Sequence, residues 1–291
     1  MKKTISFIIN PISGGINKDT FPTLIHKHID KNKFDIEIHF TKSAHHNQEL
    51  AESAVRNKKD IIVAVGGDGT INHVAKFVTD SSSIFGMIPM GSGNGLARHL
   101  KISLNHTLAL KTINNLKTVK IDTGKANNLF FINVAGAGFD AHVSGMFATA
   151  STRGFMSYAK ITLNEFAQYK PHEYTLVIDG KTINEKAFIV CVANGSQYGN
   201  NAFIAPNADL TDGVFEVSLI KPFRKRAMPF LGLDLFRKKF NDSKFVSTYR
   251  GKHIIIKRPK AEVVNIDGEP VMMDNNLSIE VFPSSLNVII P

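Results

Sequence analysis

The feature that most constrains the fold is a regular alternation of apolar runs and helical patterns over roughly the first 120 residues. The apolar runs predict strands at residues 4–10, 35–41, 60–65 and 84–89. The helical patterns cover residues 20–29, 47–57, 71–78 and 96–100, with a further stretch near 107–114. Strands that alternate with helices of this length predict a parallel sheet with helices on its faces.

The pattern changes after about Val119, where short strand candidates follow one another and Gly, Asn, Asp and Pro separate them. These candidates are at residues 120–126, 130–134, 174–179, 188–193, 214–220, 245–249, 253–257, 262–266 and 277–282, with a last one at 286–290. This pattern predicts antiparallel sheets packed as a β-sandwich, interrupted by helical insertions at about 154–169 and 225–240. We therefore expect an α/β domain at residues 1–122 and a β-rich sandwich domain at residues 123–283. The last strand, at about 284–291, could return to the first domain or stay with the second.

Composition narrows the class of protein. Lys and Arg number 35 against 25 Asp and Glu, and the formal charge of +10 favours anionic partners. The single cysteine, Cys191, excludes an internal disulfide and lies in an apolar run typical of a buried, inert thiol. No apolar run reaches the roughly 18 residues of a membrane span, so we expect any membrane contact to be made from the cytoplasmic side without crossing.

Three glycine-containing turns follow three of the predicted strands, at residues 10–15, 66–70 and 91–95. Ligands of a parallel α/β sheet bind outside the carboxyl ends of its strands, so these turns can meet at one crevice. Glycine lets backbone N–H groups approach phosphate oxygens, and a helix that starts at the turn adds partial positive charge. The alternative, that the turns are only tight connections, fits a single turn better than three.

Asp68 is unusual in a plain anion cradle, because a carboxylate repels a polyphosphate unless a cation lies between them. Its presence predicts Mg²⁺ bridging to the phosphates. The segment lacks the Gly-x-x-x-x-Gly-Lys-Ser/Thr pattern of a P-loop, so the predicted site binds phosphates through a different motif.

The segment Gly66–Thr70, followed by Ile71 and Asn72, resembles the signature shared by diacylglycerol kinases, sphingosine kinases, NAD kinases and phosphofructokinases. Three more motifs resemble the lipid-kinase members: Asn10-Pro11 with Ser13-Gly14, the turn Gly91-Ser-Gly-Asn94, and the late Asp267-Gly-Glu269. The match runs through essentially the whole chain. It implies an NAD kinase/phosphofructokinase-like α/β domain followed by a β-sandwich domain that takes a lipid substrate.

The resemblance implies ATP and Mg²⁺ as cofactors and suggests which residues contact the nucleotide. These residues are Asn10, Pro11, Ser13, Gly14, Thr41, Gly66, Gly67, Asp68, Gly69, Thr70, Ile71, Asn72, Ser92, Gly93 and Asn94. Without the resemblance, Thr41 would be interpreted as a helix cap.

The resemblance also assigns roles in the second half. A structural divalent metal is implied at Asp212, with backbone carbonyls of Asp209 and Val214, although a turn before a strand explains the same residues. Glu269 is implied as the proton acceptor, with Asp267 close to it, and Asp68 completes the catalytic set. By itself Asp267-Gly-Glu269 is typical of a turn, and the sequence does not decide which carboxylate is the base.

A membrane face is predicted at residues 221–244, where eight basic residues against two acidic ones flank apolar side chains. The alternative is a helix packed on the second domain with a solvated basic edge. We expect a membrane lipid substrate, peripheral contact with the anionic inner face of the membrane, no nucleic acid, and possible pairing of edge strands into a homodimer.

The predicted function is transfer of the γ-phosphoryl group of ATP to the hydroxyl of a membrane lipid such as diacylglycerol, giving phosphatidic acid. After Asn94 the chain continues Gly95-Leu-Ala, where many bacterial diacylglycerol kinases have Asp-Phe-Ala, so the third turn is closer to that of sphingosine kinases. A sphingoid base or another lipid is therefore an alternative acceptor. Less favoured functions are NAD kinase and a non-catalytic nucleotide sensor at the membrane surface.

Overall fold

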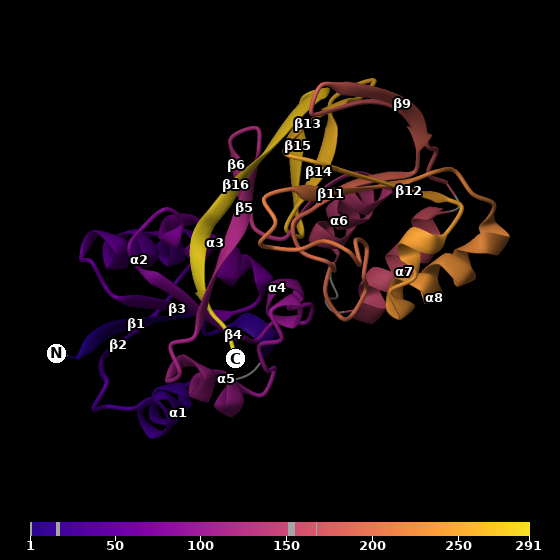
Figure 1. Cartoon of the computed structure of the whole chain (residues 1–291). Helices are drawn as coiled ribbons and strands as arrows, with labels where there is room; N and C mark the ends of the chain where they lie inside the picture. The colour runs from indigo at the N-terminus through magenta and orange to yellow at the C-terminus, as the bar shows by residue number, and fades with distance from the viewer. Residues whose placement is uncertain (1, 16–17, 151–154, 167) are drawn as a thin grey trace. The chain divides into compact units, whose positions relative to one another are not determined.

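The computed structural model describes residues 2–15, 18–150, 155–166 and 168–291, and it divides into two compact units (Figure 1). The first unit comprises Met1–Ile121 and Ser284–Pro291, and the second comprises Asp122–Pro283. These bounds lie one residue from the predicted division at 122/123 and coincide with the predicted one at 283/284. Gly154, the predicted start of a helix, lies outside the described residues.

The first unit is built on a parallel sheet. Its strands are β1 (Lys3–Ile9), β2 (Phe34–Phe40), β3 (Ile61–Gly66) and β4 (Ile84–Pro89). They lie in the order β2-β1-β3-β4, so the chain turns to opposite sides of β1 when it forms β2 and when it forms β3. Every residue of β3 is buried, as expected for a central strand covered on both faces.

The helices of this unit follow the strands in the predicted order. They are α1 (Phe21–His28), α2 (Ala44–Arg56), α3 (Asp68–Val78), α4 (Gly95–His99) and α5 (His106–Ile113). Ser43 caps α2 by accepting a hydrogen bond from the N–H of His46, and Asn105 caps α5 by accepting one from Leu108. The last strand, β16 (Asn276–Ile289), reaches this unit at its end, where Val288 pairs in parallel with Phe85 of β4.

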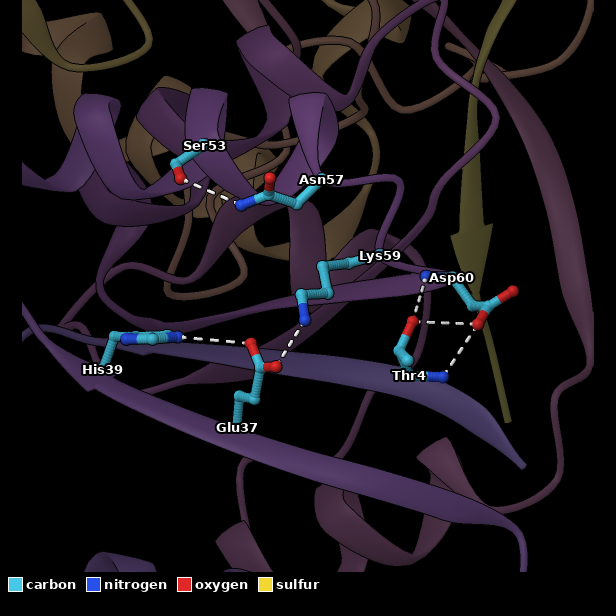
Figure 2. A network of polar contacts seen from close by, with 7 residues as sticks. All are labelled: Thr4, Glu37, His39, Ser53, Asn57, Lys59 and Asp60. Atoms are coloured by element: carbon cyan, nitrogen blue, oxygen red, sulfur yellow. Dashed lines mark hydrogen bonds and ion pairs between the residues drawn. The ribbon is translucent and has the colours of Figure 1, made fainter. Parts of the chain in front are cut away.

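A polar network ties the amino ends of β1 and β3 together (Figure 2). Oδ2 of Asp60 accepts hydrogen bonds from the N–H of Thr4 at 2.7 Å and from its hydroxyl at 2.9 Å. The backbone N–H of Asp60 donates in turn to the Thr4 hydroxyl at 3.0 Å. The hydrogen bond from the Thr4 N–H lowers the pKa of Asp60.

Replacing Asp60 by alanine is expected to lower the free energy of unfolding by about 1–3 kcal/mol at pH 7, because the Thr4 N–H loses a charged acceptor. The lowered pKa means that this contribution is present above the pKa of the unfolded chain, about 4, and is lost as the pH falls through the folded value. Urea unfolding at pH 7 and pH 3 measures both effects. The neighbouring Glu37, which pairs with Lys59 and His39 at the surface, serves as the control, and E37Q should change stability by only about 0.5 kcal/mol. Equal losses for D60A at both pH values would contradict the assignment.

The second unit is a β-sandwich with helices on one side. Its six-stranded antiparallel sheet has the order β12-β11-β10-β7-β14-β15, and β13, β8 and β9 pair antiparallel beside the first part of β16. Strand β5 (Thr118–Ala126) begins in the first unit and continues into the second. The other strands are β6 (Leu129–Phe131), β7 (Val134–Gly138), β8 (His172–Ile178), β9 (Lys181–Ala187), β10 (Ile189–Ala193), β11 (Phe215–Ile220), β12 (Val246–Gly251), β13 (His253–Lys257), β14 (Glu262–Ile266) and β15 (Glu269–Met273).

Two apolar cores lie on the two faces of the six-stranded sheet. Val190 and Val192 of β10 point into the core shared with β8 and β13, whereas Cys191 and Ala193 point into the core that the helices cover. The helices are α6 (Phe139–Thr149), α7 (Phe155–Phe166) and α8 (Met228–Arg237). Cys191 is fully buried, as predicted, and burial raises its pKa. The predicted fold class, a parallel α/β domain followed by a β-sandwich, is confirmed.

Some predicted elements are wrong in detail. The sequence pattern predicts a single strand at 130–134, but the chain forms β6 and β7 with a break at Ile132 and Asn133. Helix α6 and strands β9 and β15 are missing from the prediction, since α6 lacks a clear amphipathic pattern and both strands are rich in polar or exposed residues. The two strands predicted near 277–282 and 286–290 are one strand, β16. No helix among the described residues is long and apolar enough to span a bilayer.

Candidate active site

The three glycine-containing turns of the first unit meet at the carboxyl ends of β1, β3 and β4. The side-chain amide of Asn10, in the first turn, donates to the Thr70 hydroxyl of the second at 3.1 Å. The N–H of Met90, which follows β4, donates to the carbonyl of Gly66 at 2.7 Å. The first and second turns flank the point where the strand order reverses, which is where open α/β sheets bind ligands.

Two glycines in this site are required by close backbone contacts. Gly14 has a φ of +69°, and a Cβ there would lie 2.1 Å from the carbonyl oxygen of Met90. A Cβ on Gly91 would lie 2.8 Å from the Cα of Gly67. Any side chain at either position would separate the turns, so these glycines hold the three turns together.

Asp68 links the second turn to the third. Its Oδ2 accepts the N–H of Asn94 at 2.8 Å, and its Oδ1 accepts the N–H of Gly95 at 2.9 Å. Burial raises the pKa of Asp68, while these two hydrogen bonds act in the opposite direction. The sequence did not reveal this clamping role, because the two donors lie 26 and 27 residues further along the chain.

The clamped carboxylate still fits a magnesium site. Each carboxylate oxygen has a second lone pair, and Mg²⁺ is commonly held by one or two carboxylates together with substrate phosphates and water. The described part of the chain holds no cluster of three His, Cys, Asp or Glu side chains that would hold a metal alone. A bound Mg²⁺ would neutralise charge on the phosphates, and Asp68 would hold it.

The third turn is closed by Asn94, which adopts a left-handed conformation with a φ of 52°. Its amide nitrogen donates to the Gly91 carbonyl at 2.7 Å, and its amide oxygen accepts the Gly91 N–H at 2.8 Å. Arg98 supports the same turn by donating from Nε to the carbonyl of Gly93 at 3.0 Å. Ser92 is exposed at the tip, so its side chain can contact a ligand.

A lysine that the sequence analysis missed lies three residues after the first turn and holds it. Lys18 is only 2% exposed, and its Nζ donates to the carbonyls of Pro11 and Ser13. Burial lowers its pKa. The ammonium group of Lys18 binds two backbone carbonyls and so orients the turn. The sequence signal that could have identified Lys18 is its position within a few residues of a glycine turn.

The remaining predicted nucleotide residues lie in the same unit. Thr41 is buried at the end of β2, and its N–H donates to the carbonyl of Ile9 at 2.8 Å. The Ser13 hydroxyl donates to the carbonyl of Asn10 at 3.1 Å. Thr70 and Ile71 are buried near the start of α3, so their side chains support this end of the helix from the interior of the unit.

In the second unit, Asp267 and Gly268 form a two-residue hairpin turn between β14 and β15. Both have positive φ, 49° and 94°, which is the signature of a type I′ turn. The turn interpretation of Asp267-Gly-Glu269 is therefore correct, and it is compatible with the catalytic one. Glu269 begins β15 and is exposed.

Asp267 clamps the break between β6 and β7. Its Oδ2 accepts the N–H of Ile132 at 2.7 Å, and its Oδ1 accepts those of Asn133 at 2.9 Å and Val134 at 2.7 Å. These three N–H groups cannot enter a regular strand ladder while they donate to a carboxylate, which explains why the predicted strand at 130–134 is broken. Protonation of Asp267 would weaken all three hydrogen bonds, so the geometry favours Glu269 as the base.

In the loop predicted to bind a metal, the carboxylate of Asp212 pairs with an arginine. Oδ1 of Asp212 accepts the N–H of Val214 at 3.1 Å, and its Oδ2 is paired with the guanidinium of Arg250. Asp209 accepts both the N–H and the hydroxyl of Thr211, which is an Asx turn. The residues do not fit a divalent ion at Asp212 while Arg250 neutralises that carboxylate. The metal role of Asp209, Asp212 and Val214 stays a prediction, and no step below uses it.

A buried carboxylate beside this loop was not predicted. Asp122 is fully buried, and its Oδ2 accepts the N–H of Gly213 at 2.7 Å. The side chain of Asn194 lies close by and donates to the carbonyls of Asp122 and Ile132 at 2.7 and 2.8 Å. No sequence motif singled out Asp122, because it lies inside an ordinary strand pattern.

Comparisons with known proteins agree with the fold and the motifs. The family model described as the diacylglycerol kinase catalytic domain matches residues 4–126, and that described as the YegS C-terminal NAD kinase beta sandwich-like domain matches residues 133–290. A diacylglycerol kinase of Bacillus subtilis is 30% identical over 75% of this chain and 74% of its own length. A probable lipid kinase YegS-like of Shewanella frigidimarina is 27% identical over 82% of this chain and 79% of its own length.

The crystal structure of a diacylglycerol kinase from Bacillus anthracis superposes with a TM-score of 0.77 at 21% identity, covering 100% of this chain and 97% of the other. Its fold is therefore shared across both units. Fold and sequence together define a two-domain kinase of the lipid kinase class. The chain belongs to the diacylglycerol kinase catalytic domain family, in the form that carries a YegS C-terminal domain, and the predicted family is confirmed.

Proposed function

We propose that the protein transfers the γ-phosphoryl group of ATP to the hydroxyl of a membrane lipid, with diacylglycerol as the first candidate and phosphatidic acid as its product. The observation that carries the proposal is the junction of three glycine turns at the switch point of the first unit, clamped by Asp68. Backbone N–H groups at the start of α3 suit phosphate oxygens, whereas those of Asn94 and Gly95 at the start of α4 already donate to Asp68.

Phosphoryl transfer requires few covalent steps from the protein. It needs a positioned donor, cations that neutralise the transferring group, and a carboxylate that accepts the proton of the attacking hydroxyl. The first unit would bind ATP, with Asp68 holding Mg²⁺. Glu269, exposed on a hairpin whose turn is fixed by Asp267, would accept the proton.

The lipid assignment is supported by the relatives, which are named diacylglycerol kinase or lipid kinase. The acceptor is tested by incubating the protein with ATP labelled at the γ-phosphate and, in separate reactions, with a panel of lipid vesicles and with NAD. We expect label in an organic-extractable product with diacylglycerol. Label only with a sphingoid base would move the acceptor to that class, label in NADP would favour NAD kinase, and no label in any product would favour a nucleotide sensor.

Helix α8 and the segment before it form a candidate membrane face, which we define as the exposed residues of 224–239. Leu231 is buried in the core beneath the helix, so the packed-helix interpretation holds for that side. The opposite side exposes Phe230 and Leu233, which are 69% and 48% exposed. Basic residues that remain exposed beside them are Arg224, Lys225, Arg226, Arg237, Lys238 and Lys239.

Exposed apolar side chains flanked by basic ones suit the surface of an anionic bilayer, since each Lys or Arg near it contributes about 1 kcal/mol. This supports peripheral attachment to the inner face of the membrane. Helix α7 adds exposed Met156 and Leu163, and it packs on the same core as α8 through Phe166.

Replacing Phe230 by alanine is expected to weaken binding to vesicles that contain phosphatidylglycerol by about tenfold, because an apolar side chain no longer enters the interface. Cosedimentation with vesicles measures the change. Leu108 is 52% exposed on α5 of the first unit, and L108A serves as the matched control. Wild-type binding by F230A, or equal losses in both variants, would exclude this face.

A further inference from the structure

The hairpin turn that presents Glu269 is held by side chains from outside the turn. Asp267 and Gly268 are its two central residues, between β14 and β15. Turns at a protein surface usually leave their backbone polar groups to water. In this turn the backbone N–H and carbonyl of Gly268 are instead both bound by buried side chains. The proposed chemistry assigns no role to these side chains.

The two partners of Gly268 come from different elements. Its N–H donates to Oδ1 of Asn265, in β14, at 2.8 Å. Its carbonyl accepts a hydrogen bond from the hydroxyl of Ser144, in α6, at 3.1 Å. Asn265 and Ser144 are each 4% exposed, so water does not compete strongly for either hydrogen bond. The peptide units on both sides of Gly268 are therefore restrained, the first by the hairpin itself and the second by helix α6.

Ser144 uses its hydroxyl in an unusual way for a residue inside a helix. Helical serines commonly point to solvent or donate to the carbonyl four residues earlier. Ser144 is buried, α6 packs on β14 and β15, and the Ser144 hydroxyl donates to a carbonyl 124 residues away in the sequence. Alanine is the stronger helix former at such a position. The hydroxyl therefore contributes the contact with Gly268 rather than stability of the helix.

Hydrogen bonds are an effective restraint on Gly268 because it is a glycine in an open position. Its φ is +94°, and a Cβ there would meet no atom of the described residues within 4 Å. Glycine has the widest range of backbone conformations of any residue. The carbonyl of Gly268 belongs to the same planar peptide unit as the N–H of Glu269. A rotation of that unit would move Glu269 directly.

We propose that Ser144 is a positioning residue: its hydroxyl anchors the peptide unit between Gly268 and Glu269 to α6 and so keeps the Glu269 carboxylate in the geometry of proton transfer. Asn265 restrains the preceding peptide unit in the same way. The inference rests on the proposed function, in which Glu269 accepts the proton of the lipid hydroxyl. Displacement of a reacting group by about 1 Å can lower a rate about 100-fold, so a partly loosened turn is enough to reduce kcat.

The test compares S144A with a matched control, S218A, in the full chain. Ser218 in β11 is also buried, and its hydroxyl donates to the carbonyl of Ile204 at 3.1 Å, so S218A removes the same kind of hydrogen bond elsewhere in the unit. With labelled ATP and diacylglycerol vesicles, we expect S144A to lower kcat about tenfold without changing KM for ATP, which binds in the first unit. S218A should keep kcat within about twofold even where its melting temperature falls as much as that of S144A.

Hydrogen exchange supplies a readout that does not need activity. Mass spectrometry follows the peptide that contains Gly268 at constant pH. N265A removes the acceptor of the Gly268 N–H, so exchange there should become about tenfold faster. S144A releases the carbonyl and should give a smaller increase, at least about twofold, whereas S218A should give none. N265A also tests the effect on kcat from the other side of Gly268.

The outcomes separate positioning from general loosening and from failure of the proposed function. Wild-type kcat in S144A, or in N265A where S144A does not fold, would overturn the inference, and so would an equal loss of kcat in S218A. Unchanged exchange at the Gly268 peptide in both S144A and N265A would overturn it whatever the activity. If the wild-type protein phosphorylates no lipid, the proposed function fails, and exchange still decides whether Ser144 and Asn265 hold the turn.

Discussion

Replacing Asp68 by asparagine is expected to lower kcat at least about 100-fold while the protein stays folded, because catalytic groups displaced by as little as about 1 Å can lose this much activity. Asp68 accepts the N–H groups of Asn94 and Gly95, one on each carboxylate oxygen. Asparagine has a single acceptor oxygen, so its NH₂ group would face one of these donors and push the third turn away from the second. The substitution also removes the carboxylate proposed to hold Mg²⁺.

The initial rate of label transfer from ATP measures this loss, and calorimetric titration with ATP at low and high Mg²⁺ separates its two causes. If the clamp dominates, affinity for ATP falls at all Mg²⁺ concentrations; if the metal dominates, high Mg²⁺ restores part of it. Asp35 is exposed on β2 and pairs with Lys2, so D35N is the matched control. A D68N protein with near wild-type kcat would refute both roles.

Replacing Glu269 by glutamine is expected to lower kcat by about 10²–10⁴, the usual contribution of a general base, with no change in melting temperature. Glu269 is exposed at the start of β15, so replacing it by glutamine opens no cavity and buries no polar group. Asp267→Asn is the informative contrast, because Asp267 accepts three backbone N–H groups from the break between β6 and β7. That variant should lose about 1–3 kcal/mol of stability as one donor is left without an acceptor.

Steady-state kinetics and thermal unfolding of both variants distinguish the two carboxylates. An active E269Q together with a stable but inactive D267N would make Asp267 the base and reverse the assignment. Loss of activity in both, with loss of stability only in D267N, is the expected pattern. It assigns proton transfer to Glu269 and leaves Asp267 as the residue that holds the hairpin.

Local patterns were enough to predict most of the first unit. The apolar run of β3 and the glycine turn after it lie within ten consecutive residues, so strand, turn and helix could be recognised together. The second unit was harder. Helix α6 lacks a clear apolar face, and β15 is short and mostly exposed, so neither carries a strong periodic signal.

The candidate site shows the same division. Asn10, Asp68 and Glu269 were found from motifs that are contiguous in the chain, whereas Asp122 became visible only when the distant Gly213 was placed beside it. Asp267 is intermediate. Its motif predicted a turn or a catalytic carboxylate, and the structure shows a clamp on residues more than 130 positions away.

Periodicity, turn chemistry and short motifs are local properties of the chain, so they were sufficient to predict the α/β and β-sandwich architecture, the three glycine turns and the family. The partners of the acidic residues, in contrast, follow from tertiary contacts. Asp68 and Asp267 each use both carboxylate oxygens to accept backbone N–H groups from distant segments, and Asp212 pairs with Arg250. A carboxylate's role depends on which donors and charges surround it, and those neighbours are set by chain contacts that no local pattern encodes.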